Sequence, residues 1–249
     1  MKSPMVLTPE LVAQCEWPEP DPGPEEGYAD LTDEEYGAAA AALLQRKPPG
    51  PLWIFAYGSL LWKPAFIAVE HRRATAFGWH RAFCLELTRW RGSPQQPGLM
   101  MGLLRGGSCR GVVYRLPDAH HIGQVARLLR REVGGEDELR TVRWISVETA
   151  AGKLSALTFW ADPTGFDYSV RLPLERVAQM LARACGHIGS GADYLYRTAS
   201  ALESFCIRDR NLWRLQRLVA AEIRQMMAPA GRTESFPISA PSRDTAPPP

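Results

Sequence analysis

The chain has 249 residues, of which 45% are hydrophobic and 22% charged, and its formal net charge is +2. This is ordinary globular composition, with enough length for one sizeable domain and too little net charge to favour nucleic acid as a partner. The sequence has no run of about 18 apolar residues and no basic start followed by an apolar stretch and a cleavage site. We therefore expect a cytoplasmic protein that neither crosses nor anchors in a membrane.

The cysteines and histidines argue against disulfides and metal binding. Five cysteines are scattered along the chain, odd in number and without a Cys-x-x-Cys pair, which is typical of reduced thiols. The one histidine pair, His120-His121, consists of adjacent residues that point to different faces of a helix or strand. We predict no metal site.

Residues 1–50 are expected to form an N-terminal extension with one short helix. Four prolines between residues 18 and 24, among several carboxylates, indicate an extended arm or linker. Thr32-x-x-Glu35 is a capping box that opens an alanine-rich helix, which reaches about Lys47 before Pro48-Pro49 stops it. We expect this helix to lie on the surface of the main fold as an appendage.

Residues 51–226 are predicted to form the compact domain. Turn signals at Gly106-Gly107 and Ala151-Gly152 separate strand-like segments, and the spacing favours antiparallel or mixed pairing over a regular βαβ alternation. The segments are 53–57, 81–87, 98–104, 111–116, 142–148 and 153–160.

Two helical regions belong to the same domain. One spans residues 119–133, and a second set spans residues 174–226 and divides near Asp209. The remaining residues, 227–249, are rich in proline and serine and are predicted to be a disordered tail.

The run from Trp53 to Trp62 is broken by a polar, flexible step at Tyr57-Gly58-Ser59. A buried strand needs no such break, so it indicates a place where backbone closely approaches something else. Because Gly58 lacks a Cβ, neighbouring N–H groups can point into a pocket. We interpret the step as a binding loop, at the end of a buried strand, for a small anionic or zwitterionic ligand.

The helix predicted at 119–133 carries a carboxylate on its apolar face. Glu132 lies at helical spacing from Ile122, Val125, Leu128 and Leu129, whereas the arginines at 127, 130 and 131 take the other side. A carboxylate aimed at the core is costly unless it is paired or partly protonated.

Two explanations of Glu132 stay open at this point. The residue lies just before Gly134-Gly135, so it can simply reach solvent or an arginine at the end of the helix. Alternatively it projects into a cleft, where burial raises its pKa and makes it a usable general base near neutrality. Tyr194 is equally ambiguous. It follows Asp193, a plausible helix N-cap, and either lines a pocket with its hydroxyl or is half-buried core.

Five separated motifs, in this order and at these intervals, resemble the ChaC-type γ-glutamylcyclotransferases over about residues 53–225. They are Ala56-Tyr57-Gly58-Ser59-Leu60-Leu61-Trp62, Gly78-Trp79-His80-Arg81-Ala82-Phe83-Cys84, Arg91-Gly92-Ser93-Pro94-Gln95-Gln96-Pro97-Gly98, Gly111-Val112-Val113-Tyr114-Arg115-Leu116 and Arg131-Glu132. Two positions depart from the family pattern: the family usually has glycine where this chain has Ala56, and many members have tyrosine near the position of Leu139.

The resemblance implies an α+β domain with the γ-glutamylcyclotransferase-like fold, a small mixed β-barrel with surrounding helices. It further implies an enzyme that cleaves glutathione without a cofactor, releasing 5-oxoproline and cysteinylglycine, with Glu132 as the catalytic base. We count Tyr194 among the candidate substrate-binding residues. The others come from the family's loop motif: Ala56, Tyr57, Gly58, Ser59, Leu60 and Leu61.

Two alternatives remain at this stage. One keeps the fold and changes the substrate to other γ-glutamyl amino acids or γ-glutamylamines, and the other is a catalytically silent module that binds a γ-glutamyl-like ligand. The oligomeric state cannot be read from the sequence.

Overall fold

A five-stranded closed barrel lies at the centre of the structure, a computed structural model that describes residues 4–17, 20–24, 30–161 and 170–228. The strand order is β1-β3-β2-β4-β5, and β1 pairs with β5 in parallel while the other neighbours are antiparallel. The predicted mixed barrel is therefore confirmed. The strands are β1 (Trp53–Ala56), β2 (Glu70–Leu87), β3 (Gly98–Arg115), β4 (Val142–Thr149) and β5 (Gly152–Phe159).

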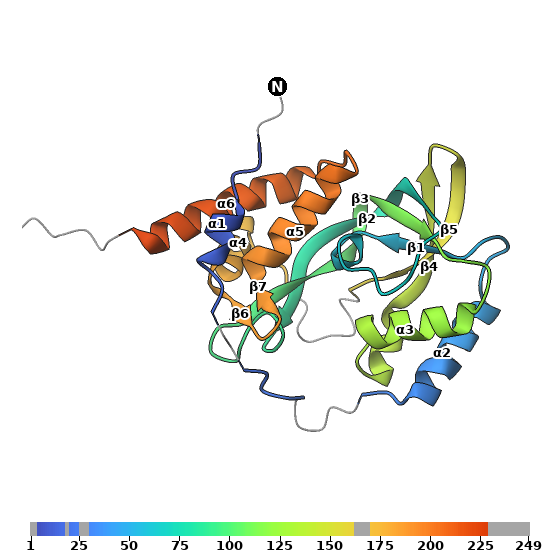
Figure 1. Ribbon diagram of the computed structural model, residues 1–249. Helices are drawn as coiled ribbons and strands as arrows, with labels where there is room; N and C mark the ends of the chain where they lie inside the picture. The colour runs from blue at the N-terminus through green and yellow to red at the C-terminus, as the bar shows by residue number, and fades with distance from the viewer. Residues whose placement is uncertain (1–3, 18–19, 25–29, 162–169, 229–249) are drawn as a thin grey trace, which may run out of the picture.

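The strands β2 and β3, of 18 residues each, form a hairpin that extends well beyond the barrel (Figure 1). The prediction of two separate strands at 98–104 and 111–116 is wrong, because the expected turn at Gly106-Gly107 lies inside β3. Gly106 and Gly107 have φ of +102° and +71°, and they face Gly78, with φ of +79°, where the pairing shifts register. Glycines tolerate these angles, so the hairpin bends at a bulge instead of ending.

Two helices cover one side of the barrel: α2 (Asp33–Gln45) and α3 (His121–Glu132) lie side by side there (Figure 1). The predicted capping box at the start of α2 is present. Tyr36, Ala40 and Leu43 are buried, so α2 is part of the packed structure and not a surface appendage.

A second group of helices gathers around the far end of the β2–β3 hairpin (Figure 1). The group contains α1 (Pro9–Ala13), α4 (Leu174–Arg183), α5 (Gly191–Ser204) and α6 (Arg210–Met227). The predicted division near Asp209 is confirmed, since its Oδ1 caps α6 by accepting hydrogen bonds from the N–H groups of Asn211 and Leu212 at 3.0 and 3.1 Å.

A further interruption of the helical region was not predicted. The short strands β6 (Cys185–Gly186) and β7 (Gly189–Ser190) form a ribbon between α4 and α5. Gly189 takes φ of +114°, a conformation that side-chain-bearing residues rarely adopt. The N-cap of α5 is Ser190, whose hydroxyl accepts from the N–H of Asp193, so the expected cap at Asp193 is wrong.

The described part of the first thirty residues is anchored and is not an extended arm. Leu7 is fully buried, and the N–H groups of Val6 and Leu7 donate to Gln216 Oε1 on α6 at 2.9 and 2.8 Å. Asp21 accepts two hydrogen bonds from Arg89. Residues 18–19 and 25–29 of the proline-rich stretch lie outside the described residues, as does most of the predicted tail. The boundary between residues 50 and 51 stays a prediction.

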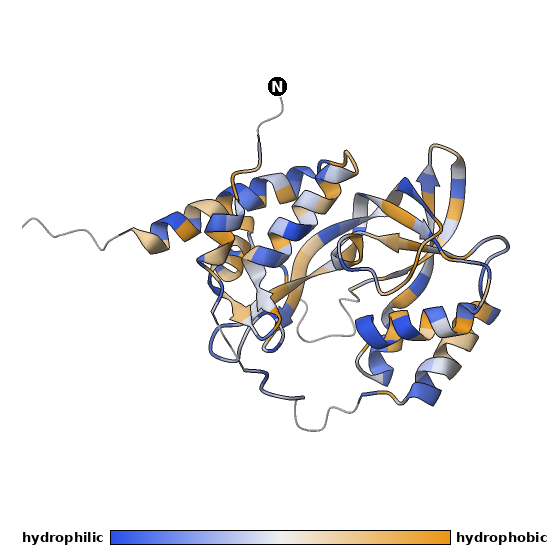
Figure 2. Ribbon diagram, in the orientation of Figure 1, coloured by the Kyte–Doolittle hydropathy of each residue, from blue (hydrophilic) through white to orange (hydrophobic). Residues whose placement is uncertain are grey.

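The strand β1 is buried on both faces, and this fixes the start of the predicted binding loop. Ile54 and Ala56 belong to the core shared with the helices, whereas Trp53 and Phe55 join a second apolar cluster of the barrel. Barrel strands carry long hydrophobic stretches, and α3, α5 and α6 carry many hydrophilic residues (Figure 2).

Among the described residues, no helix is long and apolar enough to span a membrane. All five cysteines are free thiols.

Candidate functional site

The predicted binding loop begins where β1 ends. Ala56 is fully buried and pairs with Val112, and the chain then passes Tyr57 and Gly58 into a short 3₁₀ turn, η1 (Ser59–Leu61). The side chains of Leu60 and Leu61 are buried in the shared core. They therefore anchor the turn, and the polar groups that the loop can offer a ligand are its backbone and the hydroxyls of Tyr57 and Ser59.

A close approach explains a glycine at position 58, where φ is −133° and so not left-handed. A Cβ at this position would lie 3.1 Å from Tyr194 Oη and 3.5 Å from Met101 Sδ. The first distance is shorter than an ordinary van der Waals contact. The glycine predicted from sequence is thus explained by Tyr194, which comes from α5, far along the chain.

Tyr194 is held tightly against the loop. Its side chain is buried, and its ring meets those of Trp62 and Phe83 edge-on at centroid distances of 5.8 and 5.5 Å. Burial, with a contribution from the charge of Glu132, raises the pKa of its hydroxyl to about 12, although hydrogen bonds with Ser59 and the charge of Arg91 act in the opposite direction. Tyr194 therefore stays protonated at neutral pH and can donate a hydrogen bond.

Glu132 is the last residue of α3, on the face whose other members Val125, Leu128 and Leu129 are fully buried. The expected fourth apolar member, Ile122, is exposed at the opposite end of the helix. The Glu132 side chain is 21% exposed. Burial raises the pKa of its carboxyl, and the charge of Arg131 partly offsets this. Both explanations for this carboxylate therefore have an observation behind them: burial makes it more basic, and at the end of the helix it also meets an arginine, Arg131.

Arg131 was expected to point away from this face, and that expectation is wrong. Its Nε lies 3.2 Å from Glu132 Oε1, and its Nη2 donates to Ser59 Oγ at 3.1 Å. A long side chain in the last turn of a helix can reach around the helix end, which a helical wheel does not represent. Arg131 thereby joins the candidate base to the binding loop.

Tyr57 completes the cluster. Desolvation raises the pKa of its hydroxyl well above the ordinary value, and the charges of Tyr194 and Glu132 add to the effect. Two neutral hydroxyls and one carboxylate of raised basicity thus lie within electrostatic range of one another. Such a group can remove a proton from a bound ligand and hydrogen-bond a developing negative charge.

Two buried arginines lie beside the site, Arg81 at the loop and Arg91 at Tyr194, and the sequence reasoning did not assign either of them a role. Arg81 donates from Nη1 to the Tyr57 carbonyl oxygen at 2.6 Å, and its Nε lies 3.1 Å from Asp209 Oδ2. Arg91 donates from Nη1 to the Ser190 carbonyl oxygen at 2.7 Å, and its guanidinium lies 5.3 Å from the Tyr194 ring centre. Both arginines lie in the motifs that resemble the family, and this was the one signal in the sequence that could have pointed to them.

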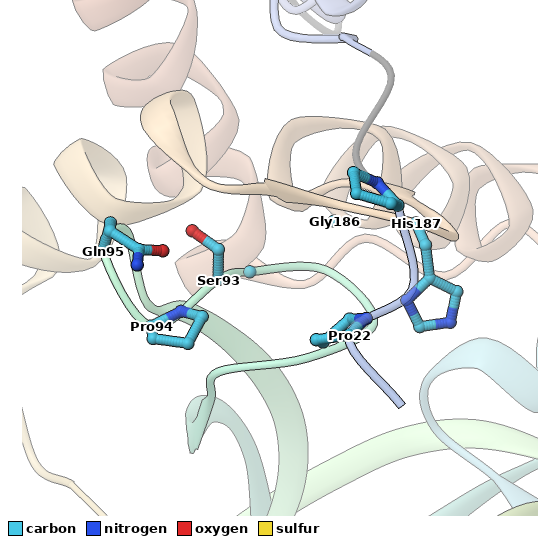
Figure 3. Close-up of a pocket in the computed structure, with 8 residues that line it drawn as sticks. Pro22, Ser93, Pro94, Gln95, Gly186 and His187 are labelled. Atoms are coloured by element: carbon cyan, nitrogen blue, oxygen red, sulfur yellow. The ribbon is translucent and has the colours of Figure 1, made fainter. Parts of the chain in front are cut away.

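A separate pocket of about 150 Å³ lies between the β2–β3 connection, the β6–β7 turn and the N-terminal segment (Figure 3). Pro22 and His187 approach it from one side, and Ser93, Pro94 and Gln95 from the other. None of the predicted site residues lines it, so it is not the predicted site. Within the described residues there is also no group of three or more His, Cys, Asp or Glu side chains placed to hold a metal ion.

Known proteins resemble this chain in both sequence and structure. The family described as ChaC-like protein matches residues 52–222. The glutathione-specific γ-glutamylcyclotransferase of Escherichia coli K12 is 36% identical over 189 residues, which cover 76% of this chain and 81% of the relative. A mouse protein named glutathione-specific γ-glutamylcyclotransferase 1 is 32% identical, with coverage of 62% and 71%.

A solved structure supports the fold. The crystal structure of a yeast γ-glutamylcyclotransferase specific to glutathione superposes with a TM-score of 0.62 at 20% identity, covering 69% of this chain and 96% of the yeast chain. At this identity the likeness shows the fold alone.

Proposed function

The chain belongs to the ChaC-like family of γ-glutamylcyclotransferases, and from this premise we propose that it cleaves glutathione into 5-oxoproline and cysteinylglycine, with Glu132 as the general base. The observation that carries the role of Glu132 is its position at the end of α3, where Arg131 lies 3.2 Å from its carboxylate and also donates to Ser59 of the loop. Burial, which raises the pKa of the carboxyl, agrees with this role. The enzyme is a carbon–nitrogen lyase. We further propose that it works in the cytoplasm, where glutathione is abundant and where the five free thiols would stay reduced.

The reaction is an intramolecular transfer. The α-amine of the γ-glutamyl residue attacks its own γ-carbonyl carbon, a five-membered lactam closes, and the bond to the nitrogen of cysteine breaks. Holding the substrate folded raises the effective concentration of the nucleophile by many orders of magnitude. Positioning by the loop therefore supplies much of the catalysis, and the chemistry needs no cofactor.

Proton transfer needs a base. The attacking nitrogen starts as an ammonium and loses two protons in all, and the leaving nitrogen gains two to depart as an ammonium. Glu132 can carry them one at a time and returns to its ionised form. A carboxyl of raised pKa suits this task, because proton transfer in both directions is most efficient when the pKa lies near the working pH.

The γ-carbonyl oxygen becomes negative as the amine attacks. We assign its stabilisation to backbone N–H groups of the loop around Gly58 and Ser59, where η1 begins without a side-chain cap. Tyr57 and Tyr194, both protonated at neutral pH, are additional donors. We assign the binding of the substrate α-carboxylate to the Ser59 hydroxyl and the remaining loop N–H groups.

The test is 5-oxoproline release from glutathione by the wild-type protein and by Glu132→Gln. The variant keeps the size of the side chain and should bind glutathione while its turnover falls to background. Near wild-type turnover of the variant would remove Glu132 from the mechanism. Parallel assays with γ-glutamyl-alanine and γ-glutamyl-lysine decide the substrate class. If 5-oxoproline is released from none of the three compounds, the protein is a binding module without this activity.

A further inference from the structure

The end of α3, where Glu132 lies, is held by a residue from the N-terminal part of the chain. Tyr36, on α2, is only 2% exposed, and its hydroxyl donates a hydrogen bond of 2.8 Å to the carbonyl oxygen of Val133. Val133 directly follows Glu132. Tyr36 lies outside the residues 52–222 that match the family.

The hydrogen bond from Tyr36 is one of two that fix the same peptide plane. The Val133 carbonyl and the Gly134 N–H belong to one rigid peptide unit. The carbonyl accepts from Tyr36, and the Gly134 N–H donates to Glu138 Oε2 at 2.9 Å. Both ends of the Val133–Gly134 peptide, one residue beyond Glu132, are therefore fixed.

This support is needed because α3 ends without a glycine cap. Its C-cap residue Val133 is extended, with φ of −131° and ψ of 119°, whereas helix ends are often closed by a left-handed residue that satisfies the last carbonyl groups. Without such a cap, the last turn relies on tertiary contacts to prevent fraying.

The helix α2 is a firm support for Tyr36. Its N-terminus is closed by the capping box of Thr32 and Glu35, and Trp144 Nε1 donates to the Leu43 carbonyl oxygen at 3.3 Å near its other end. Arg130, in the last turn of α3, pairs with Asp33 and lies over the Tyr36 ring, 5.4 Å from its centre. Contacts from α2 thus converge on the last turn of α3.

We infer that Tyr36 is a positioning residue for the reaction: its hydrogen bond to Val133 holds the end of α3, so that the Glu132 carboxylate stays beside Arg131, which donates to Ser59 of the loop. The inference rests on the proposed role of Glu132. Tyr36 is hydrogen-bonded neither to the substrate loop nor to Glu132, so its effect passes through Val133, the residue that follows Glu132.

Tyr36→Phe isolates the hydrogen bond, because phenylalanine keeps the ring that Arg130 covers. We expect kcat for 5-oxoproline release to fall by about 10- to 100-fold, the order of loss caused by a small misplacement of a reacting group. The KM for glutathione should change little. A loosened helix end would also hydrate Glu132, so the acidic limb of the kcat profile should move to lower pH.

The matched control is Trp144→Phe, which removes a side-chain hydrogen bond at the opposite end of α2, away from Glu132. It should keep wild-type kcat and the wild-type acidic limb, while both variants are compared by circular dichroism and thermal unfolding. Equal melting temperatures of the two variants with a kcat loss in Tyr36→Phe alone would support positioning.

Two results separate the possible failures. If Glu132→Gln abolishes turnover while Tyr36→Phe keeps wild-type kcat and pH profile, the positioning role is overturned and the proposed function stands. If Glu132→Gln retains turnover, the assignment of the base falls and the role of Tyr36 falls with it.

Discussion

The contact between Gly58 and Tyr194 allows a quantitative test of how the loop is held. In Gly58→Ala the new methyl group would lie 3.1 Å from Tyr194 Oη, so the hydroxyl has to move by a few tenths of an ångström. Tyr194 cannot swing freely, because Trp62 and Phe83 pack edge-on against its ring. Overpacking of this kind costs about 1–3 kcal/mol of unfolding free energy.

Thermal unfolding measures this cost. For a chain of this length, each kcal/mol lowers the melting temperature by about 2–4 °C, so Gly58→Ala should melt roughly 2–12 °C below wild type. The kcat/KM for glutathione should fall as well, since the displaced hydroxyl and loop both belong to the proposed site. Gly123→Ala is the control: a Cβ there meets nothing within 4 Å, and the substitution in a helix should stabilise by up to about 1 kcal/mol.

A double mutant identifies the cause. Tyr194→Phe removes the one atom that the Gly58 methyl would crowd, so Gly58→Ala combined with Tyr194→Phe should be less destabilised than the sum of the single changes, by about 0.5–2 kcal/mol. Strictly additive unfolding free energies would refute the reasoning that Tyr194 is what requires a glycine at position 58.

Two further predictions concern stability. The pKa of Glu132 is raised in the folded state above its ordinary value of 4.5, so between these two values the native protein keeps a proton that the unfolded chain has lost. The stability of the wild type relative to Glu132→Gln should therefore fall as the pH rises through this window. Urea unfolding at a series of pH values measures this. Arg81→Met removes the charge that faces Asp209 Oδ2 and the donor to the Tyr57 carbonyl, and it should cost about 3 kcal/mol in the same assay, against less than about 1 kcal/mol for the half-buried Arg72→Met.

Each of these predictions has a clear contrary result. A stability difference between wild type and Glu132→Gln that is flat with pH, or that grows as pH rises, would mean that folding does not raise the pKa of Glu132. Equal losses in Arg81→Met and Arg72→Met would mean that the buried arginine contributes no more than a surface ion pair.

The local elements of this protein were predictable because their signals are local. The capping box at Thr32 and the N-cap at Asp209 use side chains that bond to backbone within three residues, and α3 follows from apolar spacing along one helix. Short-range patterns also singled out the loop and Glu132, but the barrel and the roles of these residues were implied by the family resemblance alone.

Other features depend on where distant segments meet. The double glycine in β3 reads as a turn, yet it lies opposite Gly78 of β2 and forms a bulge, because pairing partners decide whether a strand continues. The first thirty residues read as an arm, yet Gln216 on α6 binds their backbone near Leu7. Composition does not record a partner that lies 209 residues away.

The sequence by itself determined which groups could do the chemistry: a glycine-containing loop after a buried strand and a carboxylate on the apolar face of a helix. Only the tertiary structure decided their surroundings. It placed Tyr194 against Gly58, turned Arg131 toward Ser59 and set Tyr36 against the end of α3. The physical reason is that the pKa and position of Glu132 depend on burial, charge and hydrogen bonds supplied by elements far apart in the chain.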